Sequence, residues 1–471
     1  MDSKRTVFST AGFLGVAGTG MLAVVLGLLG LAPMDLAQAQ PGRGIPEPTI
    51  GPDVPKEVEI AGEPPIAFFD DFSWRSFVAL NWPADVSRDQ RGVPDRSRKI
   101  GDVSVPTVWD TWKADFELFQ PKGAPPSEWA SYQAVNPCET EGWPLPVDNH
   151  PKILAQFSKL GGLNQAGFGV DGPALVSQNR AYVRYEVRIN RLEHDFIRDR
   201  KLYLAANLPK QGDPPLAFTS NSIEVKGAWR EVHGDEMASM GGRYYIVKAR
   251  VMNPVKGVCE DKSMALVGFH IVQKTPQFPQ WVWSTFEQED NVPEAGGALG
   301  HPFSLNDGDP GRQKMIPEKA PKPLGPDNPP QENPAAMQVV RLNPIAGSTQ
   351  ETNARYQAAL KGTVWAHYRL VMTQWPTDTT KPDGVPFPRP GTPNPPTNTA
   401  NTAMETYFQQ TSQSCMKCHD LARRKGLDFV WFVPLRAYTP EGPRLHAARA
   451  KTPRDQALDD LRKFIAAGEK H

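Results

Sequence analysis

The sequence predicts an α+β protein with an antiparallel β-sheet domain, flanking helices and a C-terminal helical segment. Between residues 175 and 293, apolar and polar residues alternate with a period of two, as in half-buried strands. On both sides of this region apolar residues recur every three or four positions, as on one face of a helix. Proline-rich stretches separate these parts, and a chain of 471 residues has room for about two or three domains.

Residues 1–39 have the features of a secretory signal peptide. Lys4 and Arg5 form a short basic region, residues 21–32 form an apolar core, and Ala37 to Ala39 offer a small-residue cleavage site. The apolar run is short and interrupted by glycine, so an uncleaved anchor is only the alternative. The sequence therefore predicts a bacterial periplasmic or secreted protein with no membrane span after signal cleavage.

The mature chain is expected to begin with a tether and a mixed region. Residues 40–66 are rich in proline and glycine, which is typical of a tether. Residues 67–174 form the mixed region, and it opens with an aromatic helix over 68–83. Phe69 and Phe77 lie on one side of that helix, so we expect the helix to pack into the core.

The region 175–293 is expected to form the antiparallel β domain. Its segments are rich in β-branched and aromatic residues. The last two are joined by a connection short enough for a hairpin. The predicted strands lie in residues 180–190, 218–229, 243–252, 264–275 and 281–290.

The remaining boundaries follow from proline and glycine. Residues 294–345 lack periodicity and are expected to be a linker or excursion. Residues 346–376 are expected to be a helix, and 377–398 a proline-rich loop. Residues 399–471 contain the last motif, and they close with an amphipathic helix that begins at Pro453.

The motif is Cys415, Cys418 and His419, the spacing for covalent attachment of a c-type haem. Each thiol would bond to a vinyl group of the porphyrin, and the adjacent imidazole would be the proximal ligand of the iron. The chain has one such motif, so one haem, and metal binding through its iron, is predicted. A zinc half-site is the alternative, but the C-terminal region offers only His446 and His471 as further ligands.

The sixth ligand of the iron is not fixed by the sequence. No methionine follows the motif, and His446 is the best downstream candidate for the distal position. Met404, His270 and His367 are weaker candidates, because packing in the core explains each of them equally well. The remaining possibility is a five-coordinate iron with an open, apolar distal face.

The other two cysteines, Cys138 and Cys259, stand in loop-like surroundings. In an oxidising compartment a disulfide between them is expected, and two unpaired buried thiols are the alternative. The 52 basic and 52 acidic residues give a net charge of zero. No block of like charge indicates a nucleic acid or an anionic membrane as partner.

Several segments together resemble the cytochromes c prime of beta type and their hydroxylamine-oxidising relatives. They are the strand 223–229, the hairpin 270–287 and the motif with its trailing element Asp428 to Phe432. The resemblance implies a sheet packed on a five-coordinate haem that binds small gaseous ligands. In the enzymatic branch it implies a lysine bonded to the haem, with Lys226 and Lys274 as the strand lysines. Residues 72–83 also resemble large exported monohaem cytochrome c family proteins.

Three functions follow from these observations. The first is a periplasmic c-type cytochrome that exchanges one electron with a redox partner protein. The second is a five-coordinate haem enzyme or gas-binding protein, with hydroxylamine, NO or peroxide chemistry and with the β domain as distal pocket. The third is a binding module with an aromatic surface formed by Trp74, Trp82, Trp281 and Trp283. The sequence favours electron transfer over an enzyme.

Overall fold

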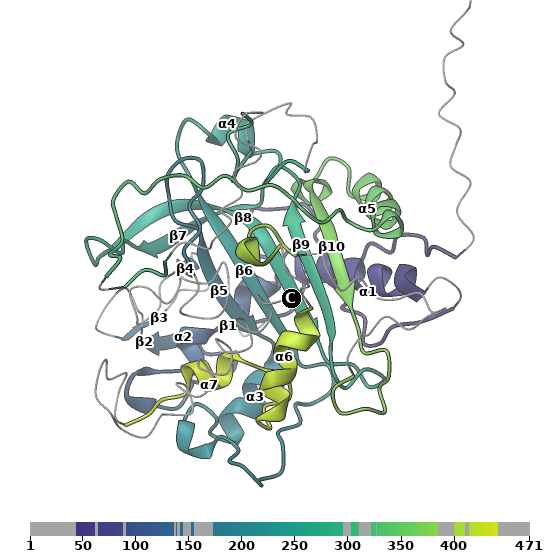
Figure 1. The fold of residues 1–471 in the computed structure, drawn as a ribbon, viewed down its shortest axis with the longest axis vertical. Helices are drawn as coiled ribbons and strands as arrows, with labels where there is room; N and C mark the ends of the chain where they lie inside the picture. The colour runs from purple at the N-terminus through teal and green to yellow at the C-terminus, as the bar shows by residue number, and fades with distance from the viewer. Residues whose placement is uncertain are drawn as a thin grey trace, which may run out of the picture. The chain divides into compact units, whose positions relative to one another are not determined.

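A mixed β-sheet forms the centre of the α+β fold (Figure 1). The protein is described by a computed structural model. All described residues lie in the unit that begins at Gly44. The described residues are 44–61, 65–87, 91–135, 138, 142–144, 152–154, 173–294, 303–309, 322–325, 327–384, 400–409 and 414–440.

The long strand β8 (Cys259–Gln273) organises the sheet. One of its edges pairs antiparallel with β6 (Ile223–Val232), which in turn pairs antiparallel with β5 (Arg184–Ile189). Its other edge is shared by β7 (Ile246–Met252) over the first half and β9 (Val282–Gln288) over the second. The sheet therefore divides into two branches along β8.

Shorter strands extend the sheet. β1 (Lys113–Ala114) pairs with β5, and β10 (Tyr368–Gln374) pairs antiparallel with β9. β4 (Lys152–Leu154) pairs parallel with β7, so the sheet is mixed rather than wholly antiparallel. A separate ribbon joins β2 (Gln133–Val135) to β3 (Gly142–Pro144).

Helices pack against both faces of the sheet. The helix α1 covers one face together with α5, and α3, α6 and α7 cover the other (Figure 1). Among the described residues, no helix is long and apolar enough to cross a bilayer. The helices are α1 (Pro65–Leu80), α2 (Asp115–Leu118), α3 (Arg191–Asp199), α4 (Met237–Met240), α5 (Gly347–Ala359), α6 (Cys415–Arg424) and α7 (Phe432–Arg436).

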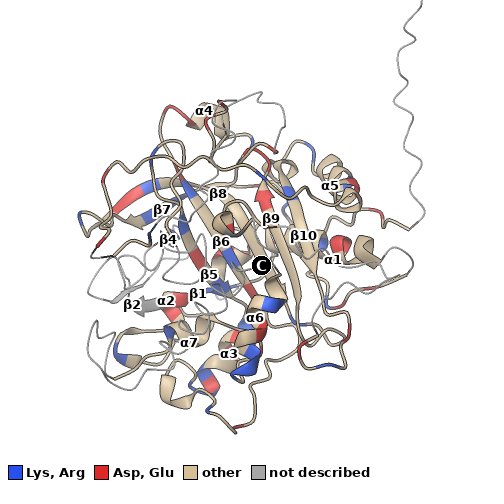
Figure 2. Cartoon of the chain, in the orientation of Figure 1, with Lys and Arg blue, Asp and Glu red and all other residues tan. Residues whose placement is uncertain are grey.

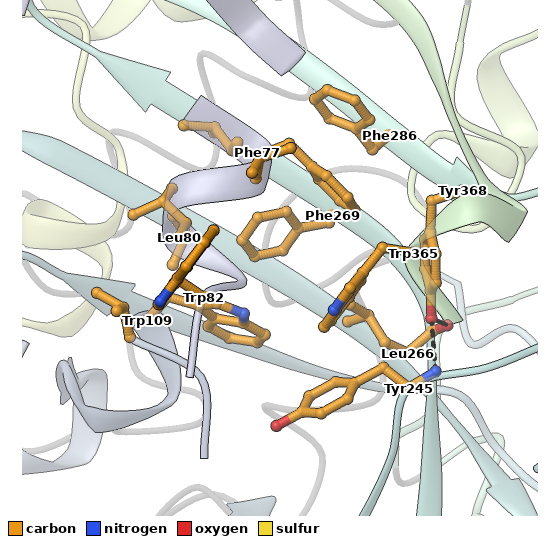
Figure 3. Close-up of a cluster of buried hydrophobic side chains, with 14 of the residues drawn as sticks. Phe77, Leu80, Trp82, Trp109, Tyr245, Leu266, Phe269, Phe286, Trp365 and Tyr368 are labelled. Atoms are coloured by element: carbon orange, nitrogen blue, oxygen red, sulfur yellow. Dashed lines mark hydrogen bonds between the residues drawn. The ribbon is translucent and has the colours of Figure 1, made fainter. Parts of the chain in front are cut away.

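The face under α1 is a core of aromatic side chains (Figure 3). Phe77 of α1 stacks on Phe286 of β9, with ring centroids 4.4 Å apart. Trp74 Nε1 donates a hydrogen bond of 2.9 Å to Asn353 Oδ1 of α5, so its polar atom is satisfied inside the core. These contacts confirm that the aromatic helix predicted near residues 68–83 packs into the core.

The five predicted strands are present as β5 to β9, but the expected helix over 346–376 differs from the structure. The helix α5 ends at Ala359, and Tyr368–Gln374 forms β10. Leu370 of β10 enters the aromatic core. A short apolar run fits helix or strand equally well, and here pairing with β9 decides the conformation.

Part of the expected tether also packs on the core. Val58 is buried, and the carbonyl of Pro55 accepts a hydrogen bond from Gln273 Nε2 at 2.6 Å. The signal peptide over 1–39 and the helix that follows Pro453 lie outside the described residues.

The predicted disulfide between Cys138 and Cys259 is confirmed. It ties the first residue of β8 to the segment before β3, across a sequence separation of 121 residues. Ala114, Phe116 and Ile153 form the small apolar cluster beside it. The bond therefore fixes the edge of the sheet where β4 and β7 pair.

Replacing both bonded cysteines should destabilise the protein. For Cys138→Ser with Cys259→Ser we expect a loss of about 2 to 4 kcal/mol in unfolding free energy, because the unfolded chain gains the freedom of a long loop. Guanidinium unfolding without reductant measures the loss. The matched control is the wild-type protein unfolded with reductant, which should lose a similar amount. Unchanged stability in both would contradict a stabilising role for the bond.

Candidate functional site

The motif opens the helix α6. Ser414 is the N-cap, and its Oγ accepts a hydrogen bond of 3.2 Å from the backbone N–H of Lys417. Cys415 is the first helical residue. Residues three and four positions apart share one face of a helix, so Cys418 and His419 lie on the same side as Cys415. The structure thus brings together the three residues that the sequence predicts for the site.

Both thiols of the motif are free and half-buried. Cys415 contacts the apolar cluster of Ile345, Val371 and Met372. Burial raises the pKa of Cys418 to about 12 and that of Cys415 further. At neutral pH both groups are therefore protonated thiols.

The imidazole of His419 is oriented by one hydrogen bond. Its Nδ1 lies 2.6 Å from the backbone carbonyl oxygen of Phe429. A carbonyl oxygen only accepts, so Nδ1 carries the proton and Nε2 keeps a free lone pair. Burial lowers the pKa of His419 to about 4, so the ring is neutral at pH 7. Trp283 of β9 packs against the ring, with centroids 4.4 Å apart.

The carbonyl that holds His419 comes from an unusual stretch of backbone. Asp428 and Phe429 have φ angles of 49° and 68°, in the left-handed region that residues other than glycine rarely adopt. Such a conformation costs about 1 to 3 kcal/mol per residue and needs support from its surroundings. The loop between α6 and α7 is therefore held by other parts of the protein.

Buried polar contacts to Asp428 supply that support. Its Oδ2 accepts a hydrogen bond of 2.5 Å from Lys274 Nζ and one of 2.6 Å from the backbone N–H of Phe218. Its backbone carbonyl accepts one of 3.1 Å from Trp281 Nε1. Lys274 and Trp281 follow β8 and precede β9, so the loop is fixed to the sheet.

Charged side chains of the sheet and of the segment before α6 face the motif. Lys226 of β6 and His270 of β8 are paired residues on adjacent strands, and His270 Nε2 lies 3.2 Å from Glu405 Oε1. Lys226 Nζ lies 5.4 Å from the centre of the Tyr185 ring. Burial alone would raise the pKa of Glu405, but the charges of His270 and Lys226 hold it below its usual value.

We call the charged and titratable side chains that face α6 the motif cluster. Its charged members Lys226, His270 and Glu405 act on the pKa of His419, and burial is the main cause of the pKa shifts of Cys415, Cys418 and His419. The motif cluster consists of Lys226, His270, Glu405, Cys415, Cys418 and His419, and each of these side chains keeps partial exposure to solvent.

The outer side of α6 is basic. Figure 2 shows lysine and arginine along α6 and α3. Asp420 is buried and accepts hydrogen bonds from Arg423 Nε at 2.5 Å and Arg424 Nε at 2.7 Å. Both arginines are thereby held beside the helix that carries the motif.

Other sequence candidates lie elsewhere. His446, the predicted distal ligand, is outside the described residues. His367 Nδ1 lies 2.8 Å from Glu289, and Met404 is buried in a different apolar cluster from the one around the motif. The tryptophans proposed for a binding surface, Trp74, Trp82, Trp281 and Trp283, are all buried, so packing explains them.

Metal binding at the motif is predicted from the sequence, and the described side chains contradict this prediction. They contain no group of three or more His, Cys, Asp or Glu side chains that could hold a metal ion. Cys415, Cys418 and His419 are among the described residues, whereas His446 and His471, the further ligands of the alternative zinc half-site, lie outside them.

Comparison with known protein families, curated proteins and solved structures found no match to this chain. The fold and the site therefore define the class of protein only by its structure. It is an α+β protein in which a Cys-x-x-Cys-His motif begins a helix that packs against one face of a mixed sheet.

Sequence reasoning missed three features of the site. The first is the Phe429 carbonyl, although the preceding Asp428 belongs to a recognised trailing element. The second is the pair of His270 with Glu405. Alternation along β8 predicts on which face of the sheet His270 lies, but not its partner. The third is the buried carboxyl group of Glu193, which no local pattern reveals.

Removing the cation that holds Asp428 should loosen the site. We expect Lys274→Met to lower the unfolding free energy by about 3 kcal/mol at pH 7, because the variant leaves a buried carboxylate without its cation. The pKa of Asp428, already raised by burial, should rise further. The loss should therefore shrink as pH falls and the carboxyl is protonated.

Chemical denaturation at pH 7 and at about pH 4 tests this expectation, together with the NMR signal of the His419 Nδ1 proton. The matched control is Lys248→Met on β7, an exposed strand lysine that bonds Ser263. Equal stability losses in the two variants would contradict the role of Lys274.

Proposed function

We propose that this protein is a periplasmic c-type cytochrome with one haem bonded to Cys415 and Cys418. In this proposal His419 is the proximal ligand of the iron, and the protein exchanges one electron with a redox partner. The observation that carries the proposal is the bond from His419 Nδ1 to the Phe429 carbonyl, which leaves a neutral Nε2 lone pair. Metal-ligating histidines commonly have their other ring nitrogen fixed in this way.

The side chains of the motif fit a covalent haem. Two unbonded, protonated thiols stand on the same helix face as the imidazole, as the addition of two S–H groups to vinyl groups requires. When bound, the haem would supply a one-electron couple. The porphyrin itself provides four nitrogen ligands, so one imidazole from the chain suffices without a cluster of protein ligands.

The other residues of the site would orient and shield the group. Trp283 packs on the imidazole, and the apolar cluster of Ile345, Val371 and Met372 contacts Cys415. The basic outer face of α6 is suited to an acidic redox partner through charge complementarity. Export is supported by the predicted signal peptide and by a disulfide, a bond typical of oxidising compartments.

A second candidate is a five-coordinate haem enzyme or gas-binding protein, as the resemblance to the cytochromes c prime of beta type implies. Lys226 favours it, because this lysine belongs to the motif cluster and burial lowers the pKa of its amine. An amine that loses its proton more easily is a better nucleophile for a bond to the haem. Lys274 is less suited to that role, because it is paired with Asp428.

Haem attachment is tested by mass and by colour. Expressed in cells that carry out c-type haem ligation, the mature protein should gain the mass of one haem and give a pyridine haemochrome spectrum of two thioether bonds. Cys415→Ala with Cys418→Ala should abolish covalent attachment. The matched control Lys417→Ala, an exposed residue on the same turn, should retain it. A colourless wild-type protein of unshifted mass would refute the proposal.

Carbon monoxide separates the two candidates. A ferrous spectrum that is unchanged by the gas indicates two protein ligands and supports electron transfer. A large Soret change indicates an open position and supports the second candidate. In that case a red-shifted band that survives denaturation and is lost in Lys226→Ala, but not in Lys274→Ala, would identify Lys226 as the bonded lysine.

A further inference from the structure

Two carboxyl groups near the motif cluster, the buried Glu193 and the partly exposed Glu224, have no part in haem attachment. Glu193 is the third residue of α3 and is fully buried. Neither of its carboxylate oxygens has a hydrogen-bond partner within the described structure. An ionised carboxylate in such a position is very unfavourable, so the group must hold a proton or share one with a neighbour.

Glu224 of β6 is that neighbour. It pairs with Ile189, the last residue of β5, and α3 begins two residues after that position. Its side chain keeps partial exposure, and it lies on the same face of the sheet as Lys226, two residues further along β6. Asn190 Oδ1 accepts backbone hydrogen bonds from both Glu193 and Ile223, so Glu224 lies beside the start of α3, and its charged neighbour Lys226 belongs to the motif cluster.

The charged groups around the pair come from three parts of the chain. Lys226 faces Glu224 from the same strand. Asp428 faces Glu193 from the loop before α7, and Lys274, which follows β8, neutralises Asp428. Because Lys274 is already paired with Asp428, Lys226 is the one cation left to balance the two carboxyl groups of Glu193 and Glu224.

This surplus of acid agrees with the ionisation of the two groups. Burial raises the pKa of Glu193 well above its ordinary value, and the charges of Glu224 and Asp428 add to the effect. Burial likewise raises the pKa of Glu224 to about 7, and Lys226 opposes the rise. Around neutral pH the pair therefore retains at least one proton that water can reach through Glu224.

We propose that Glu193 and Glu224 form the proton-exchanging pair of the site, which takes up one proton from water when one electron enters and releases it when the electron leaves. This inference rests on the proposed function. A one-electron donor supplies the electron, which reduces ferric to ferrous iron, and water supplies the proton. The one new bond is the O–H bond of the carboxyl group.

The physical cause is compensation of charge. An added electron removes one positive charge from a site of low dielectric constant, where charges interact strongly over several ångströms. A nearby carboxylate then binds a proton more tightly, so its pKa is higher in the reduced protein than in the oxidised one. By linkage, the reduction potential must fall as pH rises between these two pKa values.

The test is the reduction potential of the haem-loaded protein as a function of pH, measured by spectroelectrochemistry. Over roughly one unit on either side of pH 7, the wild-type potential should fall with a slope that approaches about 59 mV per unit, the value for one proton per electron. In Glu193→Gln the slope should be at least halved. Glu351→Gln, an exposed residue of α5, should keep the wild-type slope.

Infrared difference spectra between the two redox states give a second readout. The wild-type protein should show a protonated carboxyl band that Glu193→Gln or Glu224→Gln removes, and the second variant serves if the first fails to fold. Two results would overturn this inference and leave the proposed function intact. One is a haem-loaded wild-type protein whose reduction potential does not change with pH. The other is a pair of variants that keep both the pH slope of the potential and the infrared carboxyl band. Failure to attach haem overturns the proposed function and this inference with it.

Discussion

One hydrogen bond, from His419 Nδ1 to the Phe429 carbonyl, sets the requirements for much of the surrounding structure. The carbonyl points at the ring only because two successive residues adopt left-handed backbone. That backbone persists because Asp428 is bonded to Lys274, and this contact fixes the loop after α6 to the sheet. The helix that carries the motif is thus connected to the central sheet.

The two faces of the sheet differ in the side chains that cover them: one is an aromatic core, and the other holds the charged groups near the motif. Successive strand residues point to opposite sides, so β6 can supply Val225 to the aromatic core and Lys226 to the motif cluster. The aromatic face provides stability that does not depend on the site. The other face can therefore keep a buried acid such as Glu193, which would weaken a protein with a single core.

The sequence was informative where a signal is local. Alternation identified β5 to β9, the aromatic pattern identified α1, and two cysteines in a chain with a predicted signal peptide identified the disulfide. The cysteine and histidine positions of the site came from spacing alone. Tertiary contacts decided the rest: β10 is a strand because β9 offers an edge, and Lys226 meets His270 because of the register between β6 and β8. No local pattern in the sequence predicts the register between two strands.

The bond between Cys138 and Cys259 also has a consequence for biogenesis. Four cysteines permit three pairings, and both wrong ones would consume the thiols of Cys415 and Cys418. Both bonded cysteines precede the motif by more than 150 positions, as their numbers show. On the proposed route of export they would reach an oxidising environment first and would pair before the motif emerges. Early closure of this bond would leave Cys415 and Cys418 without either of the two wrong partners.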